Sequence, residues 1–345
     1  MTEGIASSEA CGRTCFPASL ALDPMRPVFM ASGQGSQKPG MGVSLLDVPE
    51  VAEAFQCASD VLGRDVAALV MAEGDEGAQA LNDTRNAQAA IATLSIGTGR
   101  ALMARGVQPS ALLGFSLGQI SALALAQMVS LEDAFRILDA RSAAMAQAAE
   151  EAPGVMSALL RADAESVARL CEACAQGDVL VAANYNAPGQ IVVSGTVAAI
   201  ERAEAAWKEQ GGRFSRLATA GAFHSPLMQP AAQQFGEFLQ TMQFSEPVVP
   251  LVCNTDASLA NAATIRQRLA DHLTHPVLFS QSVQALREAG AQTFAEVGFG
   301  GVLSGLVKRI DREADRFCIQ DRTSFDDYLV QWEAAQGQLA PAANA

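Results

Sequence analysis

The apolar positions along the chain follow two patterns that alternate from one stretch to the next. Short continuous apolar runs predict buried strands at residues 27–32 (PVFMAS), 111–114 (ALLG), 247–254 (PVVPLVCN) and 293–298 (TFAEVG). Apolar residues spaced three or four positions apart predict helices at residues 51–62, 87–105, 119–128, 131–150, 265–273, 277–289 and 301–310. Such alternation is typical of a mostly parallel sheet covered by helices.

The predicted elements of residues 154–219 follow a different order, βαββαβ. The strands are VMSALLR, DVLVAANY, QIVVSG and RFSRLAT, and the helices are DAESVARLCEACAQ and AAIERAEAAWKEQ. This order is that of the ferredoxin-like arrangement. We therefore predict an α/β fold with two parts. Residues 25–153 and 220–335 form a hydrolase-like core with a mostly parallel sheet, and residues 154–219 form an inserted ferredoxin-like subdomain.

The two ends of the chain lack these patterns. Residues 1–24 show no clear periodicity and are predicted to be a flexible extension, with Met25 as an alternative start, and residues 336–345 are predicted to be a flexible tail. The opening residues do not resemble a signal peptide. Because no apolar run reaches the roughly 18 residues that a membrane helix needs, we expect a cytoplasmic protein that is not bound to a membrane.

Composition and charge narrow the possible functions. Half of the 345 residues are apolar and 17% are charged, which excludes a disordered chain. The net charge of −14 argues against a nucleic-acid partner, because phosphates require a basic face. Seven dispersed cysteines suggest a reducing compartment. The single CxxC, formed by Cys171 and Cys174, has no second pair, so we predict no metal site.

The sequence GFSLG at residues 114–118 stands between a predicted strand and a predicted helix. A GxSxG in that context indicates a nucleophile elbow, in which glycines permit a sharp turn that exposes Ser116. The alternative is a glycine turn with an incidental serine. Among the three histidines, His224 follows the insertion where the chain re-enters the core, a place where clefts form, although a structural role is also open. His272 and His275 end a helix, where capping is the simpler role.

Six ordered motifs together resemble one family. They are GQGSQ at 33–37, GFSLG at 114–118, Arg141 at the end of AFRILDAR, NYNAPGQIVVSG at 184–195, GAFHSPLM at 221–228 and EVGFGGVLSGLVKRI at 296–310. This set is similar to the malonyl-CoA:acyl carrier protein transacylases of fatty acid synthesis and to the acyltransferase domains of polyketide synthases. The resemblance covers residues 25–332, and six motifs in order are far more specific than one.

The resemblance implies a serine acyltransferase that works by a ping-pong mechanism. Ser116 is the expected nucleophile and His224 its base, and the backbone N–H groups of Gln34 and Leu117 are expected to hold the oxyanion. The partners are malonyl-CoA and acyl carrier protein, both as substrates. No cofactor or metal is expected, and the chain is expected to be a monomer.

Four further residues receive roles from the same resemblance. Arg141 is expected to take the free carboxylate of the malonyl group in two parallel bonds, and Phe223 to leave no room for a branch methyl. Asn186 is expected to line the thioester cleft. The backbone carbonyl of His272, at a position that is usually glutamine, is expected to orient the catalytic histidine. The family's GHSLGE becomes GFSLGQ here, with Phe115 and Gln119 as the changed residues.

Other functions remain open at this stage. The same serine and histidine serve a thioester hydrolase, although the carboxylate anchor argues against one. A stand-alone acyltransferase of a polyketide synthase uses the same residues, and a non-catalytic docking module makes no use of them. Because both expected substrates are anionic, we also hypothesise a local basic patch on the last strand of the insertion and on the closing helix. Its residues are Arg213, Arg216, Lys308, Arg309, Arg312 and Arg316. The alternative for the closing helix is that these side chains form ordinary ion pairs with nearby acidic residues.

Overall fold

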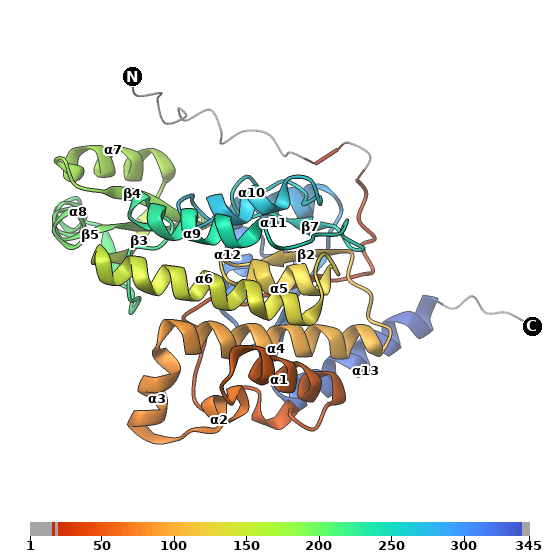
Figure 1. Ribbon diagram of the computed structural model, residues 1–345. Helices are drawn as coiled ribbons and strands as arrows, with labels where there is room; N and C mark the ends of the chain where they lie inside the picture. Colours follow the sequence, from red (N-terminus) through yellow and green to blue (C-terminus); the bar gives the residue numbers. More distant parts are fainter. Residues whose placement is uncertain (1–15, 18–19, 340–345) are drawn as a thin grey trace, which may run out of the picture.

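Two β-sheets organise the protein, whose computed structural model describes residues 16–17 and 20–339 (Figure 1). The larger sheet has the order β7-β2-β1-β8-β9, and every pairing in it is parallel. Its strands are β1 (Val28–Ala31), β2 (Ala111–Gly114), β7 (Leu251–Val252), β8 (Thr293–Val297) and β9 (Asp315–Ile319). The inner strands are buried on both faces, which is why they appear in the sequence as continuous apolar runs.

Successive side chains of these strands enter two separate apolar cores. Phe29 packs in the larger core, whereas its neighbours Val28 and Met30 pack in the smaller one. The larger core contains residues of α1 (Pro49–Leu62), α2 (Val66–Met71), α3 (Gly74–Asn82), α4 (Thr84–Ala104), α5 (Gly118–Leu125), α6 (Leu131–Glu151), α9 (Gln229–Leu239), α10 (Ile265–Asp271) and α13 (Arg322–Leu339). The smaller core contains residues of α11 (Phe279–Glu288) and α12 (Val302–Ile310). The 3-10 turns are η2 (Val43–Leu45) and η3 (Pro226–Met228).

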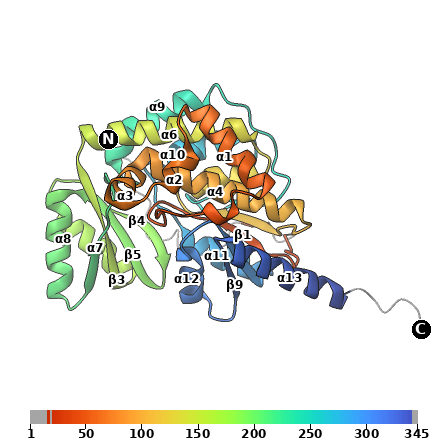
Figure 2. The same ribbon diagram turned by 90° about the horizontal axis from the view of Figure 1, so that it is seen from below.

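The second sheet is antiparallel and lies at one end of the molecule, in green in Figures 1 and 2. Its strands, in the order β4-β5-β3-β6, are β3 (Gly154–Ala162), β4 (Leu180–Ala187), β5 (Gly189–Thr196) and β6 (Arg213–Arg216). Helices α7 (Ala164–Ala175) and α8 (Val197–Glu209) pack on it around Trp207 in a core of their own. This is the ferredoxin-like topology, so the predicted fold class is confirmed.

The structure differs from the predicted elements in one place that matters for charge. Helix α12 ends at Ile310, and the chain then turns into β9, so Arg312 lies in a turn and Arg316 on a strand. The sequence analysis was wrong to place both on the closing helix. Strand β9 is an edge strand that pairs only with β8 and stays partly exposed, so it lacks the continuous apolar run that revealed the inner strands.

The ends of the chain are described only in part. The predicted flexible extension and tail fall largely on residues 1–15, 18–19 and 340–345, which lie outside the described residues. Within the described part, Leu22 is buried, and its backbone N–H donates to the carbonyl of Ala289 at 2.8 Å. Helix α13 continues to Leu339. Among the described residues, no helix is both long enough and apolar enough to cross a membrane.

Candidate active site

Ser116 stands at the sharp turn between β2 and α5. Its backbone adopts the left-handed region with a φ of 53°, which is unusual for a residue other than glycine. A Cβ at Gly114 would lie 2.1 Å from the backbone of Gly118, and one at Gly118 would lie 2.1 Å from the carbonyl of Ala31. Both glycines are therefore required by close packing, and the arrangement is a nucleophile elbow rather than an incidental glycine turn.

The side chain of His224 lies within hydrogen-bond distance of Ser116. Its Nε2 lies 2.8 Å from Ser116 Oγ, and its Nδ1 lies 2.8 Å from the carbonyl oxygen of His272. Because a carbonyl can only accept, the neutral ring carries its proton on Nδ1 and presents the lone pair of Nε2 to the serine. The serine, the histidine and the His272 carbonyl thus have the arrangement expected of a nucleophile, its base and a group that orients the base.

Burial keeps the His224 ring neutral. His224 is only 3% exposed. Desolvation, followed by the nearby charge of Arg141, lowers its pKa to about 4. The ring of His272 packs against it with the two centroids 5.0 Å apart, and desolvation holds the pKa of His272 well below its usual range. The base form of His224 is therefore present at neutral pH without any carboxylate in the triad.

This lowered pKa sets the expected pH dependence of acylation. Protonation of His224 removes the lone pair on Nε2, so activity is lost only as the pH falls through the folded pKa of about 4. We expect kcat/KM for acylation of Ser116 to change by less than about twofold between about pH 5.5 and 7.5, and to fall at lower pH. Stopped-flow acylation in a constant-ionic-strength buffer series measures this. An inflection near the ordinary histidine pKa would contradict the burial argument.

Arg141 brings a buried cation to the same point. It lies on α6 with 1% of its surface exposed, and one terminal nitrogen donates to Gln88 Oε1 at 2.8 Å while the other donates to Ser116 Oγ at 3.2 Å. Among the described residues, Arg141 forms no ion pair and its Nε has no partner. Desolvation lowers its pKa to about 10, so it remains charged at neutral pH. The geometry suits an anionic group that arrives beside the nucleophile.

Two backbone N–H groups are available near the elbow. Leu117 follows the serine, and Gln34 lies in the glycine-rich loop after β1. Neither N–H donates a hydrogen bond to another residue in the described part of the chain. The glycine-rich loop is held by the buried carboxylate of Glu296, which accepts from Ser32 Oγ at 3.2 Å and from the backbone N–H of Ser304 at 2.9 Å. These free donors have the chemistry that an oxyanion requires.

The remaining predicted residues lie outside this hydrogen-bonded set. Phe223, directly before His224, is buried in the larger core. Asn186 is buried on β4, and its Oδ1 has no partner among the described residues. The structure therefore joins Ser116, His224, Arg141 and the His272 carbonyl directly. Phe223 is adjacent to His224 in the chain, and among the described residues neither Phe223 nor Asn186 has a hydrogen bond to this set.

Three polar residues at the site escaped the sequence analysis. Gln88 holds Arg141, Asn254 binds the backbone of the elbow, and Gln119 in turn binds Asn254. A signal existed for Gln88, which is a polar residue between the apolar residues Ala87 and Ala89, and for Asn254, which ends a predicted strand. Gln119 was noticed only as a departure from the family motif.

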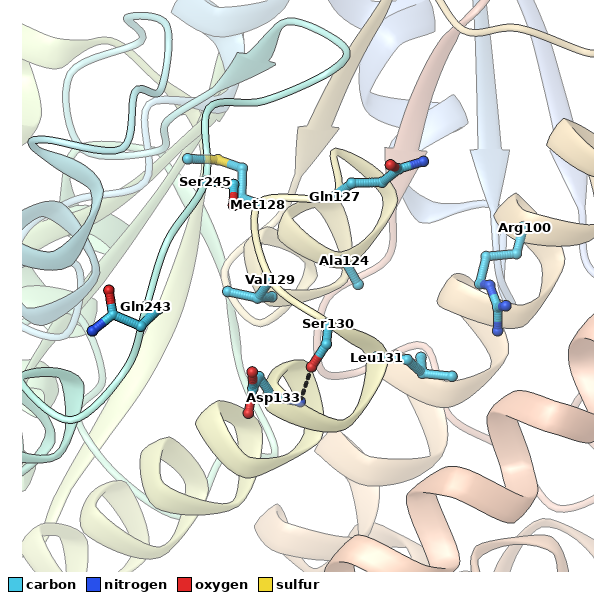
Figure 3. A pocket seen from close by; sticks show the side chains of 10 residues that line it. All are labelled: Arg100, Ala124, Gln127, Met128, Val129, Ser130, Leu131, Asp133, Gln243 and Ser245. Atoms are coloured by element: carbon cyan, nitrogen blue, oxygen red, sulfur yellow. Dashed lines mark hydrogen bonds between the residues drawn. The ribbon is translucent and has the colours of Figure 1, made fainter.

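Other features do not compete with this site. Among the described residues, no group of three or more His, Cys, Asp or Glu side chains is placed to hold a metal ion. A cavity of about 560 Å³ opens where α5 leads into α6, and Figure 3 shows side chains such as Gln127, Ser130 and Asp133 around it. None of the predicted site residues lines this cavity.

Comparison with known proteins gives a consistent picture. The family described as the acyl transferase domain matches residues 28–319. The malonyl CoA-acyl carrier protein transacylase of Haemophilus influenzae is 37% identical over 306 residues, which cover 86% of this chain and 97% of the relative. That of Salmonella typhimurium is 39% identical over 286 residues, which cover 82% and 92%.

Solved structures agree with these relatives. The malonyl-CoA:acyl carrier protein transacylase of Xanthomonas oryzae superposes with a TM-score of 0.85 at 37% identity, covering 90% of this chain and 99% of that one. A malonyl-transacylase solved in complex with a type II PKS acyl-carrier protein has a TM-score of 0.85 at 35% identity, covering 89% and 99%.

Proposed function

The chain belongs to the acyl transferase family, among its malonyl-CoA:acyl carrier protein transacylases, and from this premise we propose how its residues carry the reaction. The enzyme moves a malonyl group from CoA to the phosphopantetheine thiol of acyl carrier protein, for fatty acid chain elongation. The residue assignments rest on the hydrogen bonds that join Arg141 and His224 to the Oγ of Ser116.

The first half-reaction acylates the enzyme. Ser116 Oγ attacks the thioester carbonyl while His224 Nε2 takes its proton, and the backbone N–H groups of Leu117 and Gln34 hold the oxyanion. The carbon–sulfur bond then breaks, and His224 returns the proton to the departing CoA thiolate. The product is malonyl-Ser116, and the His272 carbonyl keeps the imidazole in its tautomer throughout.

The second half-reaction runs the same steps in reverse with a different thiol. His224 takes the proton of the phosphopantetheine thiol, whose sulfur attacks the malonyl ester. The serine leaves with that proton, and free enzyme is restored. Malonyl-CoA and the carrier protein are substrates in this scheme, and it uses no metal or other cofactor.

Arg141 supplies the preference for malonyl. Its guanidinium is buried and charged, and it lacks an ionic partner among the described residues. A malonyl carboxylate would replace the neutral contact to Ser116 Oγ with charge-assisted bonds, which an acetyl group cannot make. Phe223 and Asn186 are proposed to shape the remainder of the acyl cleft.

We propose that a single chain in the cytoplasm is the active unit. The reacting groups named above all come from one chain, so the proposed reaction requires no residue of a second subunit. The five cysteines in the described part of the chain are all free thiols, which supports a reducing compartment. The function is tested by adding malonyl-CoA with and without holo acyl carrier protein. Malonyl on the carrier supports it, whereas equal release of free malonate in both mixtures would indicate a hydrolase.

The carrier protein is proposed to dock on a small basic surface. Arg309 of α12 donates to the backbone carbonyl of Pro188 at 3.1 Å and also contacts Gln190, so its charge meets only neutral acceptors. The guanidinium of Arg309 lies beside Gly189, next to the backbone of Arg161. Together with the exposed Lys308 and Arg312, these residues form what we call the junction patch. Its members are Arg161, Lys308, Arg309 and Arg312.

The original hypothesis for this surface needs revision. Arg216 is bound by Glu204 at 2.6 Å and by Glu201, and Arg316 donates to backbone carbonyls of the turn that precedes β9. The charge of Arg216 is therefore paired with carboxylates, whereas Arg316 meets neutral acceptors but is half-buried, unlike the exposed Arg309. By contrast, no residue of the junction patch forms an ion pair within the described part of the chain. Asp311 pairs with Arg287 instead of with Lys308 or Arg312.

Charge reversal tests the junction patch. Lys308→Glu with Arg312→Glu is expected to raise the KM for the carrier protein by roughly tenfold and to weaken its salt dependence. Acylation by malonyl-CoA, which precedes docking, should change little. Arg309 is left intact because it contacts the β4–β5 turn. The matched control is Arg169→Glu on α7, whose side chain is 63% exposed. An unchanged carrier KM in the double variant would remove the patch from the proposal.

A further inference from the structure

Asn254 binds the nucleophile elbow on both sides of the turn. It lies two residues after the end of β7 and is 0% exposed. Its Oδ1 accepts the backbone N–H of Ser116 at 2.8 Å, and its Nδ2 donates to the carbonyl oxygen of Gly114 at 2.7 Å. The side-chain amide therefore spans the residue before Phe115 and the residue after it, and both of its polar atoms are used.

Asn254 is itself held in place by two other elements. Its backbone N–H donates to Gln119 Oε1 at 3.1 Å, and its carbonyl accepts the N–H of Leu278 at 2.8 Å. Gln119 lies in the first turn of α5 and is 1% exposed, so its amide cannot exchange this bond for one to water. The elbow, the start of α5 and the end of β7 are thus tied together through a single asparagine.

The hydrogen bonds of Asn254 determine which backbone N–H groups of the elbow are available to a ligand. Ser116 has a φ of 53°, an unfavourable conformation for a side chain, so something must hold it. The bond to Asn254 Oδ1 directs the Ser116 N–H into the protein, while the next N–H, that of Leu117, stays free. A change at Asn254 would therefore shift both the serine hydroxyl and the Leu117 donor, with no direct contact to the acyl group.

We propose that Asn254 is a positioning residue for acyl transfer: held by Gln119, it fixes the elbow so that Ser116 Oγ meets His224 Nε2 and Leu117 N–H faces the oxyanion. The inference rests on the proposed function of Ser116. Because Arg141 and the acyl cleft are not part of this bracing, the effect falls on kcat and not on KM.

Two substitutions at Asn254 test the positioning role. Asn254→Ala is expected to lower the acylation rate about 100-fold while the KM for malonyl-CoA stays within about threefold. Asn254→Asp keeps an acceptor for the Ser116 N–H, but its charged form has no donor for the Gly114 carbonyl. When the aspartate is protonated it regains that donor. Its acylation rate should therefore rise as the pH falls from about 8 to about 6, where the wild-type rate stays level.

Variants of Gln119 test the same proposal if Asn254→Ala does not fold. Gln119→Leu removes the acceptor for Asn254 N–H and is expected to lower the acylation rate roughly tenfold, whereas Gln119→Glu retains an acceptor and should retain more activity. Asn261→Ala is the matched control, because within the described residues its Oδ1 accepts from Thr264 alone, at the start of α10.

The outcomes separate this inference from the proposed function. If the wild-type enzyme forms no malonyl-Ser116, the proposed function fails first. If it does, an Asn254→Ala acylation rate within threefold of wild type overturns the positioning role. The positioning role is also overturned if the loss of activity appears in KM instead of kcat. It is likewise overturned if the pH dependence of the acylation rate is the same for Asn254→Asp and wild type.

Discussion

Replacement of Ser116 by alanine is expected to lower malonyl transfer to acyl carrier protein by roughly 10⁴-fold or more. The substitution removes the atom to which His224 Nε2 and Arg141 are both hydrogen-bonded, and the scheme offers no second nucleophile at that point. Transfer is followed by the appearance of malonyl-carrier protein in a mass spectrum. Binding of malonyl-CoA should persist, because Arg141 and the cleft remain.

A matched serine separates loss of the nucleophile from loss of the fold. Ser121 lies on α5, one helical turn further, and is buried with no partner for its Oγ among the described residues. Ser121→Ala should therefore leave transfer near the wild-type rate. Full activity in Ser116→Ala would exclude Ser116 as the nucleophile. Equal carrier-protein binding by wild type and variant, with no transfer by either, would support the docking-module hypothesis instead.

Replacement of Arg141 by methionine is expected to change activity and stability in opposite directions. Methionine keeps much of the apolar stem but loses the charge that would bind the malonyl carboxylate, so kcat/KM for malonyl-CoA should fall by roughly 100- to 1000-fold. Acetyl-CoA lacks that carboxylate, and its use should fall much less. The wild-type cation is buried without an ionic partner in the described part of the chain, so its removal should raise Tm.

The control for Arg141 lies on the same helix. Arg136 is 56% exposed and pairs with Asp133, so Arg136→Met should alter neither the malonyl preference nor Tm by much. Competition between malonyl-CoA and acetyl-CoA in one mixture measures the preference directly. An unchanged ratio in Arg141→Met would remove the arginine from substrate selection.

The parts of the fold that were predicted correctly are those with local signals. Strands β1 and β2 are buried on both faces and appear as unbroken apolar runs, and helix α6 is capped by Ser130, whose Oγ accepts the N–H of Asp133. Strand β9 has no such run, because it lies at the edge of the sheet. Helices α2, α3, α9 and α13 were also missed.

The site residues also differ in whether a local sequence signal predicts them. Ser116 could be predicted from the glycines around it, because the turn is local, and the other roles came from ordered motifs. The bonds of Gln88 and Asn254 join residues far apart in the chain, so no local pattern contains them. The junction patch shows the same limit, since only the folded structure reveals that Glu204 neutralises Arg216 while Lys308 has no ionic partner in the described part of the chain.

Isolation of the covalent intermediate tests the proposed mechanism most directly. Enzyme is mixed with malonyl-CoA in the absence of carrier protein, quenched in acid, digested and examined by mass spectrometry, and a second sample receives holo acyl carrier protein before the quench. The mechanism predicts one malonyl group on the peptide that contains Ser116, and its loss to the phosphopantetheine thiol in the second sample. An unmodified Ser116 peptide during active transfer, or malonyl that leaves only as free malonate, would contradict it.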